Sequence, residues 1–286
     1  MTKKLKLMVG AACVLALCVF ALAGCSSSNS SSSSSSAASS GASNSSTTLI
    51  VGFDSAYPPY GFVDNNGEYT GFDLDLAKEV AARNGWDIQL EAIDWDAKDA
   101  LLNSGAINCI WNGFTMEGRE GSYTFSEPYM LNEQVIVVKK GSDIADFAGL
   151  SGKTVMTQVD SAALDVLEST EDGGQAKLAA TFAGGAPQTI GDYNNAFLQL
   201  DSGMVDAVAC DLSIAQYQIA ANPDKYTQLE TPLSEEHYAV GFKQGDTERA
   251  EAVNKTLKEM YADGTVKTLC EKYADYGMSY DNWILK

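Results

Sequence analysis

Short apolar runs alternate with longer amphipathic stretches along most of the chain. The runs have the β-branched, apolar character of buried strands and lie at residues 49–53, 88–93, 107–111, 135–138, 154–157 and 205–209. The stretches with helical spacing of apolar positions lie at residues 73–84, 192–203, 212–221 and 247–262. Gly85 follows the first of them, where a left-handed glycine commonly ends a helix. This order predicts an α/β fold.

The part of the chain from residue 48 to residue 286 is long for a single core and fits two lobes. Two extended stretches, residues 134–139 and 238–243, each link a segment of one predicted lobe to a segment of the other. We predict that they form a two-strand hinge. Lobe 1 then comprises residues 48–137 plus 240–286, and lobe 2 comprises residues 138–239.

The N-terminus has the pattern of an export signal. Three lysines in the first six residues precede an apolar run at residues 7–22, which is too short to span a bilayer comfortably. The run ends in Leu-Ala-Gly-Cys, which resembles the bacterial lipobox and implies that Cys25 is lipidated and begins the mature chain. Residues 1–24 are thus predicted to be a lipoprotein signal peptide. The alternative is an ordinary signal peptide with a chance cysteine.

Residues 25–47 consist almost wholly of Ser, Ala, Asn and Thr. Such a composition cannot bury enough apolar surface to offset the entropy of ordering, so we predict a flexible tether. A lipid on Cys25 and this tether would hold the folded body at the cell membrane, on the extracytoplasmic face, within reach of a membrane partner. No later segment is apolar and long enough to span a bilayer.

The charge of the chain limits its partners, and the setting of its cysteines indicates their role. Without residues 1–24 the chain keeps 16 basic and 38 acidic residues, a charge of −22, which disfavours nucleic acid. We expect a monomer that needs no cofactor and no metal. Cys109, Cys210 and Cys270 lie in apolar stretches without metal or redox spacing, so we expect small buried side chains; a single disulfide is the alternative.

A long motif indicates a family. Residues 71–81, with the sequence GFDLDLAKEVA, resemble the signature of bacterial extracellular solute-binding proteins of family 3, the polar amino-acid binders. Further matching segments follow in the family's order, at residues 54–60, 112–115, 125–129, 203–208 and 262–265. The resemblance spans nearly the whole body. It implies a two-lobed, periplasmic-binding-protein-like fold of type II, which closes on its ligand between the lobes.

Binding a free amino acid requires partners for a carboxylate and an ammonium that both leave water. A guanidinium suits the carboxylate because its planar fork donates two parallel hydrogen bonds. The resemblance assigns this role to Arg119, together with the backbone N–H and hydroxyl of Thr115. Four steps separate these residues where the family commonly has five. A solvated ion pair of Arg119 with Glu117 or Glu120 is the alternative.

For the ammonium, the resemblance points to Asp211, which follows an apolar strand at its carboxyl end. The alternative is a helix N-cap. The backbone of Gly113 is a further candidate acceptor. Ser161 and Ala162 lie at the start of a predicted helix, which begins near Ala162 and whose free N–H groups suit an anion. The alternative for Ser161 is the role of N-cap, which is compatible with binding.

Aromatic side chains gather at positions that would line the cleft: Tyr57, Tyr60, Trp95, Trp111 and Phe114. The resemblance places Trp95 and Tyr57 on opposite walls around the ligand side chain. Tyr60 and Trp111 fit the core equally well. Asp54 is a second acid near the cleft, which binds the ligand or orients its own turn. Aromatic walls with nearby acids suit a polar or cationic side chain, or cystine.

We therefore expect a binding protein that delivers a free amino acid to the permease of an ABC importer. A dehydratase-like enzyme on the same fold is one alternative, and a ligand-sensing surface lipoprotein is another. The chain holds one histidine, His237, and no order of residues typical of nucleophilic catalysis. We expect this protein not to be an enzyme.

Overall fold

The computed structural model describes residues 47–286. The predicted signal peptide, the lipidation site at Cys25 and nearly all of the tether lie outside the described residues. Within residues 47–286, no helix has the length and apolar character needed to cross a membrane. The described chain builds two main sheets, each with its own helices, and one small sheet.

The first sheet draws its strands from both ends of the described chain. Its order is β5-β1-β6-β14-β7, in which β5, β1 and β6 are parallel and β14 is antiparallel to β6 and β7. These strands are β1 (Thr48–Phe53), β5 (Asp87–Ala92), β6 (Cys109–Ile110), β7 (Tyr123–Phe125) and β14 (Gly241–Lys243). Its helices are α1 (Phe72–Asn84), α2 (Lys98–Ser104), α7 (Thr247–Ala262) and α8 (Thr265–Lys272), and α1 contacts both α7 and α8.

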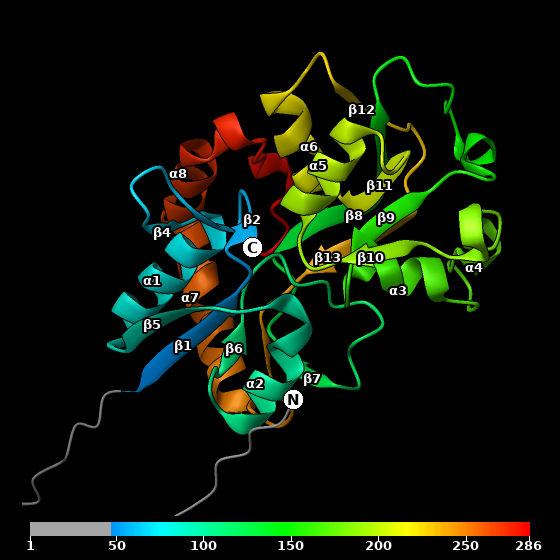
Figure 1. The fold of residues 1–286 in the computed structure, drawn as a ribbon. Helices are drawn as coiled ribbons and strands as arrows, with labels where there is room; N and C mark the ends of the chain where they lie inside the picture. Colours follow the sequence, from blue (N-terminus) through cyan, green and yellow to red (C-terminus); the bar gives the residue numbers. More distant parts are fainter. Residues whose placement is uncertain (1–46) are drawn as a thin grey trace, which may run out of the picture. The chain divides into compact units, whose positions relative to one another are not determined.

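The second sheet uses the middle of the chain, in the order β10-β9-β11-β8-β12, with β13 paired to β8. Its strands are β8 (Met130–Lys139), β9 (Val155–Gln158), β10 (Gln188–Ile190), β11 (Ala207–Asp211), β12 (Tyr226–Gln228) and β13 (Ser234–Tyr238). Its helices are α3 (Ala162–Glu168), α4 (Ala176–Ala179), α5 (Tyr193–Ser202) and α6 (Leu212–Ala221). Helices α5 and α6 cover one face of the sheet and α3 covers the other (Figure 1).

Short elements complete the fold. The small sheet joins β2 (Ala56–Tyr57), β3 (Gly61–Val63) and β4 (Tyr69–Thr70). The 3-10 turns are Trp95–Ala97, Phe147–Leu150, Ala183–Gly185, Ala274–Tyr276 and Tyr280–Asn282. The predicted helices are confirmed to within about two residues at each end. Gly85 ends α1 with φ of 66°, in the left-handed conformation expected of it.

The two connections between the sheets differ from the predicted hinge. Residues 130–134 of β8 pair antiparallel with residues 234–238 of β13, and Figure 1 shows the two strands side by side at the junction of the sheets. The predicted segments do not pair with each other. Residues 134–139 of β8 pair with β11 and β12, and β14 lies inside the first sheet. The apolar run of β8 is therefore core of the second sheet, while the connecting strands carry polar side chains that a hydrophobic pattern does not reveal.

All three cysteines of the body, Cys109, Cys210 and Cys270, are buried and free. Cys109 and Cys210 lie in β6 and β11, within the apolar core, and burial raises the pKa of both thiols above the ordinary value. They act as small core side chains, as expected.

Candidate functional site

The strand ends that the sequence singles out meet where the two sheets face each other. Asp54 follows β1, residues 111–115 follow β6, Gln158 ends β9 and Asp211 ends β11. Asp54 accepts a hydrogen bond from Nε2 of Gln158 at 2.8 Å and another from the backbone N–H of Ala56 at 2.8 Å. Burial raises the pKa of Asp54. Asp54 thus holds its own turn and also joins the first lobe to the second.

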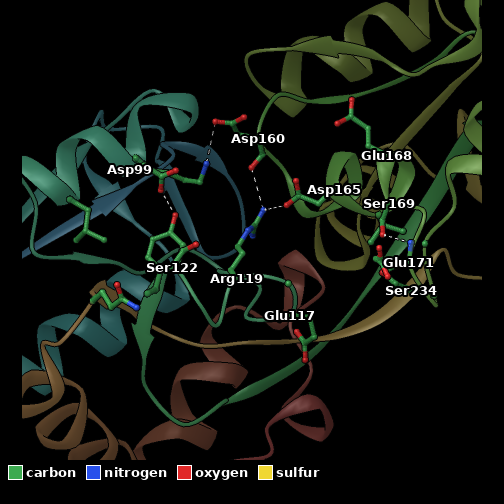
Figure 2. Close-up of a pocket in the computed structure, with 18 of the residues that line it drawn as sticks. Asp99, Glu117, Arg119, Ser122, Asp160, Asp165, Glu168, Ser169, Glu171 and Ser234 are labelled. Atoms are coloured by element: carbon green, nitrogen blue, oxygen red, sulfur yellow. Dashed lines mark hydrogen bonds and ion pairs between the residues drawn. The ribbon is translucent and has the colours of Figure 1, made fainter.

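Arg119 reaches from the first lobe to α3 of the second. Its Nη2 donates to Oδ2 of Asp165 at 2.7 Å, and it lies 3.4 Å from the backbone carbonyl of Asp160. Its Nη1 donates to the carbonyl of Thr115 at 3.4 Å, and the guanidinium lies 5.0 Å from the ring centre of Phe114. Figure 2 shows the Arg119 side chain pointing toward Asp160 and Asp165, with a dashed line to each. Only 11% of the side chain is exposed.

The alternative role considered for Arg119, an ion pair with a neighbouring glutamate, is not what the structure shows. Its ion pair is with Asp165, while Glu117 pairs with Nδ1 of His237 at 2.6 Å. Arg119 lies on the wall of an open cavity of about 1100 Å³ between the lobes. Eight of the 22 residues that line the cavity are acidic, including Asp165, and three are basic. None of the other predicted ligand-binding residues lines it.

Asp211 lies away from this cavity, in a buried cluster of polar side chains. Its Oδ1 accepts from Nε2 of Gln134 at 2.7 Å, from Nδ2 of Asn132 at 3.0 Å and from the hydroxyl of Tyr238 at 2.8 Å. Asp211 occupies the N-cap position of α6, but its side chain caps no helix N–H. The N-cap alternative is therefore wrong for the carboxyl group. Burial raises the pKa of Asp211.

Thr115 connects the two regions. Its carbonyl accepts from Arg119, while its hydroxyl donates to Oε1 of Glu236 in the buried cluster at 2.8 Å. Glu236 also accepts from Asn132 at 2.7 Å and from Gln134 at 2.8 Å. Burial and then the charge of Asp211 raise the pKa of Glu236 to about 7. The structure thus brings Thr115 and Asp211 into one cluster and leaves Arg119 at its outer edge, turned toward Asp165.

Gly113 lies in a turn that requires glycine. Its φ is 57°, and a Cβ atom there would lie 2.9 Å from the ring of Tyr238 and 3.2 Å from the ring of Tyr57. Its N–H donates to Oδ2 of Asp73 at 2.6 Å. The hydroxyls of Tyr57 and Tyr238 lie 3.2 Å apart. Gly113 therefore lets two aromatic rings approach the backbone beside Asp211.

The remaining candidates divide between the junction of the lobes and the core. Nε1 of Trp95 donates to the carbonyl of Asp160 across the junction at 3.1 Å. Trp111 and Phe114 are fully buried, in two apolar clusters. Ser161 caps α3 by accepting from the N–H of Leu164 at 3.2 Å, and Ala162 is the first residue of that helix. The capping role of Ser161 is confirmed.

Sequence reasoning missed the polar face of the connecting strands. Asn132 and Gln134 of β8 and Glu236 and Tyr238 of β13 are all buried and all contact the Asp211 cluster or belong to it. The available signal was their spacing, since polar residues two apart share one face of a strand.

Among residues 47–286, no group of three or more His, Cys, Asp or Glu side chains could hold a metal ion.

Comparison with known proteins gives one consistent result. Residues 49–276 match the bacterial extracellular solute-binding proteins of family 3. The L-cystine-binding protein TcyA of Bacillus subtilis is 30% identical over 79% of this chain and 80% of its own length. The arginine-binding extracellular protein ArtP of the same organism is 28% identical over 95% of this chain and 98% of its own.

Comparison with solved structures leads to the same kind of protein. An ABC uptake transporter substrate-binding protein from Streptococcus pneumoniae, solved with bound histidine, is 32% identical and superposes with a TM-score of 0.75 over 79% of this chain and 92% of that one. Tv2483 bound to L-arginine is 26% identical, with a TM-score of 0.74 over 83% and 93% of the two chains. The chain therefore belongs to the bacterial extracellular solute-binding proteins of family 3 and has their two-lobed fold.

Proposed function

We propose that this protein is the substrate-binding component of an ABC importer, which captures a free amino acid between its lobes and delivers it to the permease. The observation that carries the proposal is the position of Thr115, with a guanidinium at its carbonyl and the buried Asp211 cluster at its hydroxyl. Positive and negative partners thus flank one residue, as the two ends of a zwitterion require.

In this proposal the ligand carboxylate replaces Asp165 as the partner of Arg119. Asp165 is 60% exposed, so its ion pair with Arg119 is a weak competitor, worth about 1 kcal/mol or less. The ammonium goes to Asp211. The ligand then favours closure of lobe 1 (48–137 plus 240–286) on lobe 2 (138–239), because only the closed form presents both partners.

The side chain of the ligand is proposed at the level of a class. Trp95 and Tyr57 would form walls around a polar or cationic side chain, or cystine. The names of the relatives fit this range, since they are described as binding cystine, arginine, histidine and glutamate. We propose that the ligand is released unchanged, because the relatives are named as binding proteins and not as enzymes.

The site of action is also part of the proposal. Cys25 would carry the lipid, residues 25–47 would serve as the tether, and the body would work as a monomer on the extracytoplasmic face of the cell membrane. Metabolic labelling with a fatty-acid analogue tests the anchor: wild-type protein should be labelled and Cys25→Ala should not. Labelling of the variant would contradict lipidation at Cys25.

A thermal-shift screen against the twenty amino acids plus cystine and ornithine tests the function. A true ligand at about a thousandfold excess over Kd should stabilise the body by roughly 4 kcal/mol. Mass spectrometry of the recovered ligand should find it unchanged. A screen in which no compound raises Tm would contradict the amino-acid proposal, and chemical conversion of a bound compound would favour an enzyme.

A further inference from the structure

Asp211 and Glu236 form a pair of buried carboxyl groups that share their hydrogen-bond donors. Nε2 of Gln134 lies 2.7 Å from Oδ1 of Asp211 and 2.8 Å from Oε1 of Glu236. Nδ2 of Asn132 lies 3.0 Å and 2.7 Å from the same two oxygens. Since both oxygens contact one nitrogen, they are at most 5.5 Å apart. Asp211 is 4% exposed and Glu236 is 2% exposed.

Among residues 47–286, no positively charged side chain is hydrogen-bonded to or ion-paired with this pair of carboxyl groups. The other side-chain donors are the neutral hydroxyls of Thr115, on the turn after β6, of Tyr238, on β13, and of Tyr57, on β2. His237 follows Glu236 on the strand, so it points to the opposite face, where it pairs with Glu117. Arg119 uses its guanidinium on Asp165. Two buried carboxylates without a cation are costly, so an empty site must hold a proton or remain strained.

Gln134 carries a second sign of a missing partner. Its Nε2 donates to both carboxyl groups, but its Oε1 is buried and has no hydrogen-bond donor. A buried acceptor left unpaired loses the hydrogen bonds that water would give it, which destabilises the folded state. An ammonium group has three N–H donors and a positive charge. It would supply a hydrogen-bond donor for Oε1 of Gln134 and a positive charge for the two carboxyl groups.

We propose that Glu236 is a positioning residue of the ammonium site, which shares one proton with Asp211 while the site is empty and releases that proton when the ammonium binds. This inference rests on the proposed function, since it needs a ligand with an ammonium group. The proton leaves a carboxyl oxygen and goes to the solvent buffer. The ligand ammonium takes its place as the positive charge between the two carboxylates.

The pKa values agree with this assignment. Burial, followed by the charge of Asp211, raises the pKa of Glu236 to about 7, and burial raises the pKa of Asp211. Because two such close carboxyl groups titrate as a pair, the empty pair retains one proton below about pH 7. The affinity for ligand should then fall about tenfold for each pH unit below that value, since one proton competes with the ammonium.

Isothermal titration calorimetry in buffers of different ionisation enthalpy tests the proposal. L-Arginine, L-cystine and L-glutamine are the probes, because their own groups change little in charge between about pH 5.5 and 6.5. At about pH 6, wild-type protein should release close to one proton per bound probe. Glu236→Gln should release none, and its affinity should vary little across this range. Glu235→Gln is the matched control, since Glu235 is the exposed neighbour on β13, and it should behave as wild type.

The outcomes separate this inference from the proposed function. Binding by the wild type without proton release would overturn the role of Glu236 and leave amino-acid binding intact. Equal proton release by wild type and Glu236→Gln would also overturn it. Failure of wild type to bind any amino acid would contradict the proposed function and this inference with it. The wild-type measurement stands even if Glu236→Gln does not fold.

Discussion

At the residue scale, the proposed function requires a charged partner for each end of the ligand. Arg119 is held in place by the carbonyl of Thr115, the ring of Phe114 and the carboxylate of Asp165. A guanidinium aligned by several contacts loses little entropy on binding a carboxylate. Asp165 balances the charge of Arg119, and in the proposed function a ligand carboxylate replaces it.

Arg119→Ala should weaken amino-acid binding by more than about 2 kcal/mol, roughly thirtyfold, because it leaves the ligand carboxylate without a charged donor. Arg119→Lys should recover part of the affinity, since it restores the charge without the planar fork. Asp165→Asn should keep or raise the affinity, by up to about fivefold, because it removes an exposed competitor. Calorimetric titration measures all three. Wild-type affinity in Arg119→Ala would show that the carboxylate binds elsewhere.

Individual residues were predictable from the sequence where a motif or a strand end marks them. Arg119, Thr115 and Asp211 come from such positions, and Thr115 and Asp211 lie in one cluster in the structure. The target of the Arg119 side chain was not predictable, because Asp165 is far away in the sequence and meets it only through the approach of the lobes. Glu236 was missed because it lies among charged neighbours that give it the pattern of a surface residue.

At the element scale, the turn after β6 and the two connecting strands form one unit. Thr115 forms a β-bridge with Tyr238, and Met130 forms one with Trp283, so both connecting strands are fixed to the first lobe at one end. Their other ends belong to the second sheet. The Asp211 cluster therefore lies directly on the strands that connect the two lobes.

Gly113→Ala should destabilise the protein by about 2 kcal/mol or more. The backbone of residue 113 is in the left-handed region, which is strained for any residue with a Cβ atom. The new Cβ would also lie 2.9 Å from the ring of Tyr238, which is too close. Gly118→Ala is the matched control, because it also has a positive φ, of 79°, but open space around the Cβ position. It should cost only about 1 kcal/mol. Urea unfolding measures both, and equal losses would mean that the close approach to Tyr238 does not matter.

The positions of most helices and strands were predictable from the hydrophobic pattern, but the position of the hinge was predicted wrongly. The run of apolar residues in β8 has both faces covered and is typical of a central strand. Because this run has the pattern of an extended segment, the sequence pattern places one hinge strand at residues 134–139. The actual connection begins at Met130 and includes Asn132, whose burial is possible only because it donates to two carboxyl groups.

At the scale of the whole molecule, buried carboxyl groups link stability to pH. Burial raises the pKa of Asp73 to about 7 in the first lobe, and burial with the charge of Asp211 raises that of Glu236 to about 7 at the junction. The folded protein therefore binds more protons than the unfolded chain between about pH 4.5 and 7. The stabilisation is complete below the unfolded pKa and is lost as the pH rises through the folded value.

The Tm of the ligand-free protein should thus fall as the pH rises from about 5 to 8. Glu236→Gln should show a smaller fall than wild type, because one of the groups responsible is gone. Scanning calorimetry at intervals of pH measures both slopes. A Tm that rises over this range, or a slope unchanged by the substitution, would contradict the assignment of raised pKa values.

The two-lobed architecture itself was predictable, because alternating strands and helices, the length of the body and the family motif all indicate it. The contacts between the two lobes were not predictable from the sequence. They depend on pairs such as Asp54 with Gln158 and Trp95 with Asp160, which are far apart in the chain and carry no local signal. These contacts decide which site residues face each other.

In the proposed function, Arg119 binds the carboxylate of one zwitterion while the pair of Asp211 and Glu236 binds its ammonium group. Calorimetric titration with the amino acid of largest thermal shift, its decarboxylated amine and its analogue without the α-amino group tests this most directly. The intact amino acid should bind with a Kd of about 1 μM or lower, about −8 kcal/mol. Each truncated compound should lose more than about 2 kcal/mol. An amine or an acid that binds as tightly as the intact amino acid would contradict the claim.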